Sequence, residues 1–217
     1  MKYQGVIFDL DGTLLDTLED LAFAANSTLA AFGFPQHQTA DYRYFVGEGL
    51  NILMRRIIPP SAVSGEMVQN CMKKFSEIYK ECWNIHTVPY RGVPEMIAGL
   101  SAAGVKLAVL SNKPHAFTQI CVKSFFPNHP FLYVYGQRDG IAKKPDPAGA
   151  LELAARMKLS VDNILYVGDT ATDMQTGNRA GMKTIGVEWG FRDREELEKN
   201  KAWKIAAAPA EIVSYVI

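Results

Sequence analysis

Two carboxylates stand two positions apart near the start of the chain, directly after a short apolar run. Asp9 and Asp11 follow residues 6–8, and Gly12 comes next. The apolar run is typical of a strand buried on both faces, and glycine permits a sharp turn at its end. Paired carboxylates at such a place can act as a nucleophile, as a proton donor or as ligands of a hard cation.

Polar side chains also follow two later apolar runs, residues 105–110 and 164–167, and a basic pair lies between these runs. The side chains concerned are Ser111, Asn112, Lys113, Lys143, Lys144, Asp169, Thr170 and Asp173. Because the carboxyl ends of parallel strands lie along one edge of a sheet, we expect these groups to gather there with Asp9 and Asp11.

That set of groups suits phosphoryl transfer. A phosphate monoester carries about two negative charges at neutral pH, so a carboxylate can approach it only where cations and hydrogen-bond donors offset those charges. Mg²⁺ suits the set better than Zn²⁺, because the predicted ligands are oxygen atoms without histidine or cysteine. The nucleophile must attack in line while a second carboxyl group protonates the departing alkoxide.

Each of these residues also has a structural alternative when it is considered alone. Asp11 belongs to an Asp-Gly pair, a common turn former, and Ser111 or Asp169 could cap the helix that follows. Asp173 could be a first-turn carboxylate favoured by the helix dipole, and Lys144 could be a solvated surface residue. Their occurrence together after successive strands favours the functional interpretation.

The elements that would position these residues alternate along most of the chain. Strands are predicted at residues 5–8, 105–110, 131–135, 164–167 and 184–187, and helices at 93–103, 114–126, 145–157 and 171–180. Alternating strands and helices indicate a parallel sheet covered by helices. The predicted fold class is therefore α/β, with a doubly wound, Rossmann-like parallel sheet.

Residues 16–87 interrupt this alternation with helical patterns alone. Apolar residues recur at helical spacing in residues 18–32 and 67–82, with a shorter helix near residues 51–57. We therefore predict an α/β core formed by residues 1–15 and 88–217, and an all-helical cap domain formed by residues 16–87. An insertion directly after the first strand would serve as a lid over the carboxyl ends of the strands.

The composition argues against several other classes of protein. The chain has 217 residues, 48% of them hydrophobic, and 23 Lys and Arg balance 23 Asp and Glu. This balance argues against nucleic acid or a membrane surface as a partner, and no apolar stretch approaches the roughly 20 residues of a membrane span. The start of the chain has no signal-peptide pattern, and three cysteines without CxxC spacing are expected to be buried, reduced thiols. We expect a cytoplasmic protein, monomeric or homodimeric.

Taken together, the motifs resemble those of the haloacid dehalogenase superfamily of phosphohydrolases. Residues 9–13, 111–113, 144–145 and 168–173 match its four motifs in order. The matching core covers roughly residues 1–15 and 88–190, and the joint occurrence of four motifs is far more specific than any one of them.

The resemblance implies a catalytic role for four residues. Asp9 would be the nucleophile and would form an aspartyl-phosphate. Asp11 would be the general acid for the leaving group and then the general base for the hydrolytic water. Ser111 would hold a phosphate oxygen, and Lys144 would offset charge on the nucleophile and the phosphate.

The resemblance also implies a metal site. Mg²⁺ would be bound by Asp9, by the backbone carbonyl of Asp11 and by Asp169, with Asp173 in support through water or Lys144. Thr13 would contact the phosphate or organise the turn.

Several local strings look like those of phosphoglycolate phosphatases. They are Phe45-Val46-Gly47-Glu48-Gly49-Leu50, Ser111-Asn112-Lys113-Pro114, Lys144-Pro145-Asp146-Pro147 and Val187-Glu188-Trp189-Gly190. This resemblance implies a small phosphorylated metabolite as substrate, with 2-phosphoglycolate favoured. Gly47 and Gly49 would let backbone N–H groups approach a small anion, and Thr13 and Asn112 are further candidates for substrate contact.

Other substrates of the same chemistry stay open: a nucleotide, a sugar phosphate or pyrophosphate. A phosphomutase similar to β-phosphoglucomutase is disfavoured, because Gly168-Asp169-Thr170 stands where sugar phosphomutases typically carry Glu-Asp-Ser. A dehalogenase proper would lack the second acid, which is present here as Asp11.

Overall fold

The computed structural model describes residues 2–128 and 130–217 and divides the chain into two compact units. The first unit comprises Met1–Asp16 and Pro89–Ile217, and the second comprises Thr17–Val88. We call them the α/β unit and the helical unit. Among the described residues, no helix combines the length and the apolar composition that crossing a membrane requires.

The α/β unit is built on a six-stranded sheet with the order β5-β4-β1-β6-β7-β8, and its strand pairs are parallel. The strands are β1 (Gly5–Phe8), β4 (Lys106–Pro114), β5 (Phe131–Gln137), β6 (Ile164–Gly168), β7 (Lys183–Val187) and β8 (Lys204–Ala206). A separate two-stranded sheet pairs β2 (Leu15–Asp16) with β3 (Val88–Pro89).

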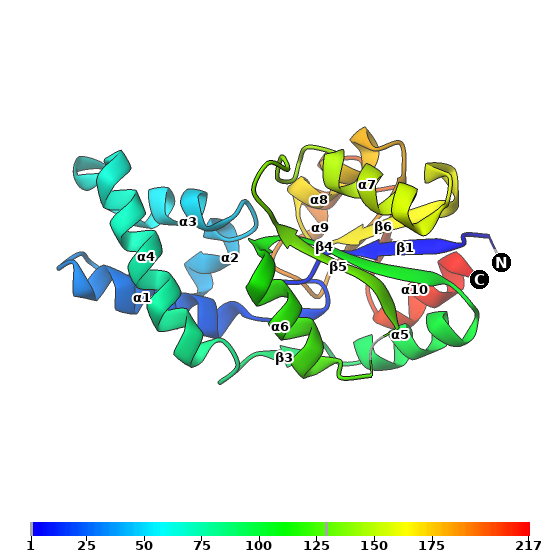
Figure 1. Cartoon of the computed structure of the whole chain (residues 1–217), viewed down its shortest axis with the longest axis horizontal. Coiled ribbons are helices and arrows are strands. Elements are labelled where there is room, and N and C mark those ends of the chain that lie inside the picture. Colours follow the sequence, from blue (N-terminus) through cyan, green and yellow to red (C-terminus); the bar gives the residue numbers. More distant parts are fainter. Residues whose placement is uncertain (1, 129) are drawn as a thin grey trace. The chain divides into compact units, whose positions relative to one another are not determined.

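Helices cover both faces of the large sheet (Figure 1). On one face lie α5 (Val93–Ala102), α6 (His115–Phe125) and α10 (Pro209–Val216), and on the other lie α7 (Ala148–Met157), α8 (Ala171–Arg179) and α9 (Arg194–Lys199). A 3₁₀ turn at Val161–Asn163 leads into β6. This arrangement confirms the predicted α/β class with a doubly wound parallel sheet.

The central strand β1 sets the edge at which the polar residues meet. All four of its residues are buried, and Phe8 aligns with Val109 of β4 and Val167 of β6. Apolar side chains from β1, β4 and β6 pack with those of α7 to form one core cluster, which includes Ile7, Ala108 and Leu153. The chain therefore leaves these three neighbouring strands at the same edge of the sheet.

Some predicted bounds differ from the observed ones. Strand β4 continues past Leu110 to Pro114, so the polar string 111–113 belongs to the strand itself. Helix α7 begins at Ala148 rather than at residue 145, because Asp146 Oδ1 accepts a hydrogen bond from the Ala148 backbone N–H at 2.8 Å in the preceding turn. Strands β2, β3 and β8 were not predicted, since each has only two or three residues.

The helical unit contains α1 (Leu18–Ala31), α2 (Tyr42–Phe45), α3 (Leu50–Ile57) and α4 (Gly65–Cys82), with 3₁₀ turns at Thr39–Asp41 and Pro60–Ala62. Both α1 and α3 pack against α4. The buried face of α4 is formed by residues at helical spacing, namely Val68, Cys71, Phe75, Tyr79 and Cys82. The chain's three cysteines are free thiols and buried, as predicted.

Candidate active site

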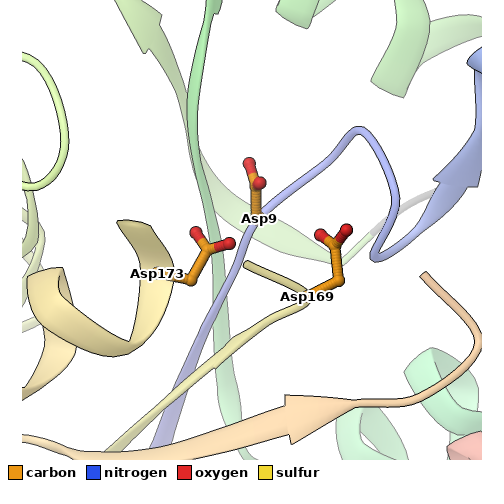
Figure 2. Close-up of side chains that lie close together, drawn as sticks. All are labelled: Asp9, Asp169 and Asp173. Carbon is orange, nitrogen blue, oxygen red and sulfur yellow. The ribbon is translucent and has the colours of Figure 1, made fainter. Parts of the chain in front are cut away.

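Three aspartates from separate elements form a buried acidic cluster at the carboxyl edge of the sheet. Asp9 follows β1, Asp169 follows β6, and Asp173 lies in the first turn of α8 (Figure 2). Each offers a carboxylate oxygen, and these oxygens all lie within 4.8 Å of one another. The sheet register explains why Asp9 and Asp169 lie close together, because β1 and β6 are neighbouring strands that end at the same level.

Lys144 provides positive charge to this cluster from within the protein. Its side chain is 3% exposed, and its Nζ lies 2.9 Å from Asp9 Oδ1 and 2.7 Å from Asp173 Oδ1. Burial acts to lower the pKa of Lys144, but the carboxylates of Asp173 and Asp9 outweigh it and raise the pKa well above its ordinary value. The ammonium is therefore a permanent cation at neutral pH.

The carboxyl group of Asp9 is the least well compensated of the three. Burial raises its pKa to about 8, and the neighbouring charges of Asp173 and Asp169 act in the same direction, against the opposing effect of Lys144. Among the described residues, no group donates a hydrogen bond of normal geometry to Asp9 Oδ1, although the Lys144 ammonium is close. Further positive charge near Asp9 is therefore needed to keep its carboxyl group ionised at neutral pH.

Asp169 is oriented by two hydrogen bonds. Its Oδ1 accepts from the Thr13 hydroxyl at 2.8 Å, and its Oδ2 accepts from the Phe191 backbone N–H at 2.9 Å. Burial and the charge of Asp173 still raise its pKa to about 7. Gly12, with φ +85°, and Gly190 pack so tightly on Asp169 that a β-carbon at either position would overlap its side chain.

Asp173 links the helix to the lysine. Its Oδ2 accepts hydrogen bonds from the backbone N–H (3.1 Å) and hydroxyl (2.7 Å) of Thr170, while its Oδ1 accepts one from Lys144 Nζ. The contact with Thr170 is a capping box that begins α8. Asp173 is thus a first-turn carboxylate of α8, as the structural alternative proposed, and this position coexists with its contact to Lys144.

Asp11 belongs to a second, separate ion pair. Its Oδ1 and Oδ2 lie 2.9 and 3.2 Å from Nζ of Lys113, whose side chain is 3% exposed. Lys113 comes from the end of β4, so this pair spans two neighbouring strands. The two predicted acidic residues of the first motif are thus paired with different lysines, Asp9 with Lys144 and Asp11 with Lys113.

The remaining predicted residues of the α/β unit lie in the same region but are engaged within the protein. The amide of Asn112 donates to the Lys144 carbonyl at 3.1 Å and accepts from the Lys144 N–H at 2.9 Å, and so positions that lysine. Ser111 is buried and its Oγ accepts from the Lys113 N–H at 3.2 Å. Contact of Thr13, Asn112 and Ser111 with a substrate stays a prediction.

Gly47 and Gly49 lie in the helical unit, in the loop between α2 and α3. Both have positive φ angles, +119° and +87°, which few residues other than glycine adopt. Arg56 is bound to this loop, because its guanidinium meets Glu48 and donates to the Phe45 carbonyl at 3.1 Å. Contact of Gly47 and Gly49 with a substrate likewise stays a prediction.

Two structural contributors were not selected from the sequence. Lys113 was noted as part of the second motif without a role, and its partner Asp11 is 102 positions away. The indole N–H of Trp189 donates to the Thr13 carbonyl at 3.0 Å and thereby supports the turn that orients Asp169. The one sequence signal for Trp189 is that its string, Val187-Glu188-Trp189-Gly190, looks like those of phosphoglycolate phosphatases.

The acidic cluster has the chemistry of a site for a divalent cation. The carboxylates of Asp9, Asp169 and Asp173 lie together, but the ammonium of Lys144 contacts only those of Asp9 and Asp173. Burial together with mutual repulsion raises the pKa of both Asp9 and Asp169. A hard cation with oxygen ligands would relieve this repulsion and keep the carboxylates ionised. The residues present therefore fit a metal ion.

Comparison with known proteins agrees with this arrangement. The family model for haloacid dehalogenase-like hydrolases matches residues 6–187. Phosphoglycolate phosphatases of Pseudomonas putida and of Vibrio cholerae serotype O1 are each 32% identical to the chain over 197 residues. These alignments cover 89% and 88% of this chain, and 72% and 87% of those proteins.

The fold has equally similar relatives among solved structures. A crystal structure of a candidate phosphoglycolate phosphatase from Lactobacillus delbrueckii subsp. bulgaricus superposes with a TM-score of 0.94 at 31% identity. It covers 100% of this chain and 99% of that one. Together with the family match over most of the sequence, this places the chain in the haloacid dehalogenase-like hydrolase family, among its phosphatases.

Proposed function

We propose that this enzyme is a Mg²⁺-dependent phosphomonoesterase that acts through an aspartyl-phosphate on Asp9, with 2-phosphoglycolate as its substrate. The observation that supports it most directly is the pairing of the two acidic residues of the first motif with different lysines. This separation gives Asp9 and Asp11 different surroundings, as a nucleophile and a proton carrier require.

In the first half-reaction, a carboxylate oxygen of Asp9 attacks phosphorus and the bond from phosphorus to the ester oxygen breaks. The departing alkoxide takes a proton from the carboxyl group of Asp11. Lys144 offsets charge on Asp9 and on the phosphoryl group during the attack, and Ser111 donates its hydroxyl hydrogen to a phosphoryl oxygen. The products of this step are the free alcohol, here glycolate, and an acyl phosphate on Asp9.

In the second half-reaction, Asp11 is a carboxylate and accepts a proton from water. The water oxygen forms a bond to phosphorus while the bond between phosphorus and the Asp9 oxygen breaks. Inorganic phosphate leaves, Asp9 is again a carboxylate, and Asp11 is again protonated. One ester and one water molecule give one alcohol and one phosphate, so the cycle balances.

Asp9 and Asp169, together with the Asp11 backbone carbonyl, would hold the Mg²⁺. Asp173 would act in support through its contact with Lys144. When bound, Mg²⁺ supplies positive charge next to the phosphoryl group. The fit of a hard cation to the acidic cluster supports this assignment.

The choice of substrate is supported by the relatives. Phosphoglycolate phosphatases are about one-third identical in sequence to this chain over most of its length. We further propose that the helical unit acts as the cap of the enzyme and that its loop with Gly47 and Gly49 contacts the substrate. In this proposal the enzyme is cytoplasmic and acts on a small metabolite.

A substrate panel tests the proposal. Free phosphate is measured with 2-phosphoglycolate, 5′-nucleotides, sugar phosphates, pyrophosphate and p-nitrophenyl phosphate, with Mg²⁺ and after EDTA treatment. We expect the highest kcat/KM with 2-phosphoglycolate and loss of activity with EDTA. A kcat/KM for 2-phosphoglycolate no higher than for generic esters would contradict the substrate, and activity that survives EDTA would contradict the metal.

A further inference from the structure

Lys113 is a buried cation next to the proposed proton carrier and apart from the proposed nucleophile. Its Nζ contacts both oxygens of Asp11 at 2.9 and 3.2 Å, and its side chain is 3% exposed. The corresponding cation for Asp9 is Lys144, which comes from a different part of the chain and also contacts Asp173. Phosphoryl chemistry at Asp9 uses Lys144, and this leaves the purpose of Lys113 to be explained.

We propose that Lys113 determines specificity by binding a carboxylate on the leaving group of the substrate. The substrate class would then be phosphomonoesters that carry a carboxylate close to the ester oxygen. This inference rests on the proposed function, because it takes Asp11 as the residue that protonates the leaving group. It goes further by naming the residue that recognises the leaving group and the chemical feature that it recognises.

The dimensions of such a substrate allow its carboxylate to contact Lys113. Asp11 must come within hydrogen-bond distance, about 3 Å, of the ester oxygen in order to protonate it. In an ester of this class the carboxylate carbon is two covalent bonds of roughly 1.5 Å each from that oxygen. An ammonium that contacts Asp11 at 2.9 Å is therefore within reach of the substrate carboxylate when the leaving group extends along the side of Asp11 that faces Lys113.

The chemistry of an ammonium group permits both contacts at once. It carries three N–H donors that can be shared among acceptors, so Lys113 can bridge Asp11 and a second carboxylate. Because the side chain is buried, its attraction for an anion is less weakened by water than that of a surface lysine. A leaving group without an anion would gain at most a hydrogen bond from this position, and an alkyl leaving group would gain none.

Lys113 could instead serve only to neutralise Asp11, and kinetics with two matched esters separates these roles. Ethyl phosphate differs from 2-phosphoglycolate only in having a methyl group in place of the carboxylate. A lysine that only neutralises Asp11 affects both esters to the same extent. A lysine that binds the carboxylate affects the ratio of their kcat/KM values.

The experiment measures this ratio, with Mg²⁺ present, for the wild type and for the variants Lys113→Met, Lys113→Arg and Lys123→Met. We expect Lys113→Met to lower the preference for 2-phosphoglycolate about 100-fold, the order of effect expected for a lost buried charge pair. Lys113→Arg keeps the charge and should restore most of the preference. Lys123 is an exposed lysine of α6 in the same unit and serves as the control that should leave the ratio unchanged.

A binding measurement checks the same point without turnover. The probes are 3-phosphonopropionate and propylphosphonate, which have no cleavable ester bond and differ by a carboxylate. We expect calorimetry to show that the wild type prefers 3-phosphonopropionate and that Lys113→Met loses this preference. Circular dichroism and a melting curve of each variant identify any loss of folding, in which case Lys113→Gln replaces Lys113→Met.

The outcomes distinguish a failure of this inference from a failure of the proposed function. An unchanged ratio in Lys113→Met, or a wild type that prefers no carboxylate-bearing ester, overturns the role of Lys113. If another carboxylate-bearing ester exceeds 2-phosphoglycolate and Lys113→Met removes that preference, the proposed substrate is wrong and the role of Lys113 stands. If p-nitrophenyl phosphate and all other esters are inert, the proposed function is wrong and the phosphonate binding ratio still decides on Lys113.

Discussion

Two buried aspartates, one in each unit, differ sharply in how the protein compensates their charge. Asp20 lies in the first turn of α1 in the helical unit, and Asp9 follows β1 in the α/β unit; their exposed fractions are 1% and 6%. The carboxylate of Asp20 accepts hydrogen bonds from the Thr87 N–H (2.9 Å) and hydroxyl (2.7 Å), and from the His86 N–H. Residues near the two ends of the helical unit are thereby joined.

Both carboxyl groups are shielded from solvent, yet their pKa values shift in opposite directions. Burial acts to raise the pKa of Asp20, but the hydrogen bonds from Thr87 and His86 outweigh it and hold the pKa below its ordinary value. Burial raises the pKa of Asp9 to about 8, and the nearby carboxylates add to the increase. Hydrogen-bond donors therefore offset burial at Asp20 and make it a structural anchor, whereas burial and neighbouring carboxylates prevail at Asp9.

The largest expected effect is on activity at Asp9. We expect Asp9→Asn to lower kcat about 10⁴-fold, because the amide cannot form an acyl phosphate. Its melting temperature should be equal to or above that of the wild type, since one of several mutually repelling buried carboxylates is removed. Turnover of p-nitrophenyl phosphate and thermal melts measure both quantities, with the exposed Asp162→Asn as control. Retained turnover would contradict the nucleophile assignment.

The next effect is on stability at Asp20. We expect Asp20→Asn to lower the free energy of unfolding by about 3 kcal/mol, because an amide in that place cannot accept all the hydrogen bonds that the carboxylate accepts. Urea denaturation measures the loss. The neighbouring Glu19→Gln is the matched control, since this side chain is exposed and should change stability by less than about 0.5 kcal/mol. Equal effects of Asp20→Asn and Glu19→Gln on stability would contradict the role of Asp20 as a structural anchor, and with it the contrast between Asp20 and Asp9.

The two carboxylates should also give stability opposite dependences on pH. The folded-state pKa of Asp20 is below its unfolded value of about 4, so its contribution is complete above that pH and is lost as pH falls through the folded pKa. The destabilisation by Asp20→Asn should therefore shrink as pH falls from 6 towards 3. Urea midpoints of wild type and variant across this range test it, and a constant difference would contradict the assignment.

The raised pKa values of Asp9 and Asp169 predict that the stability of the metal-free protein falls as pH rises, the reverse of the dependence expected from Asp20. Their folded-state pKa values, about 8 and about 7, exceed the unfolded value of about 4, so the folded state binds more protons between these limits. The melting temperature in EDTA should accordingly fall as pH rises from 5 to 8. Mg²⁺ should raise it by several degrees at pH 8, and Asp169→Asn should lose most of that increase. A melting temperature that does not change when Mg²⁺ is added would contradict the metal site.

The sequence was sufficient to predict every strand of the large sheet except β8, and the edge of that sheet at which chemistry was expected. Short apolar runs mark β1 and β6 because both faces of these strands are buried, and the polar residues after them are then placed by the parallel register. The extension of β4 to Pro114 was not predictable in this way. Its residues 111–113 are polar yet buried, since they lie against the acidic site rather than against an apolar core.

The pairing of charges could not be predicted from spacing alone. By spacing alone, lysines at positions 113, 143 and 144 were equally available to Asp9 and Asp11. The resemblance paired Lys144 with Asp9, but nothing paired Lys113 with Asp11, because that choice depends on packing between segments more than 100 residues apart. Asn112 was predicted to contact the substrate, but its amide is engaged by the Lys144 backbone. Asp20 had no distinguishing pattern at all, because its partners lie 66 and 67 positions later.

The smallest expected effect concerns Glu48, an exposed counterpart of Asp20 within the helical unit. The side chains of Glu48 and its ion-pair partner Arg56 are 41% and 33% exposed, so Glu48→Gln should change the free energy of unfolding by less than about 1 kcal/mol.

Arg56 also binds the Tyr44 and Phe45 carbonyls, and losing its carboxylate partner should loosen the loop that leads to Gly49. If that loop contacts substrate, KM for 2-phosphoglycolate should rise about threefold, while Glu77→Gln, in an exposed ion pair of α4, should leave it unchanged. A stability loss as large as that of Asp20→Asn would show that exposure does not separate anchoring carboxylates from dispensable ones, and an unchanged KM would remove this loop from the substrate site.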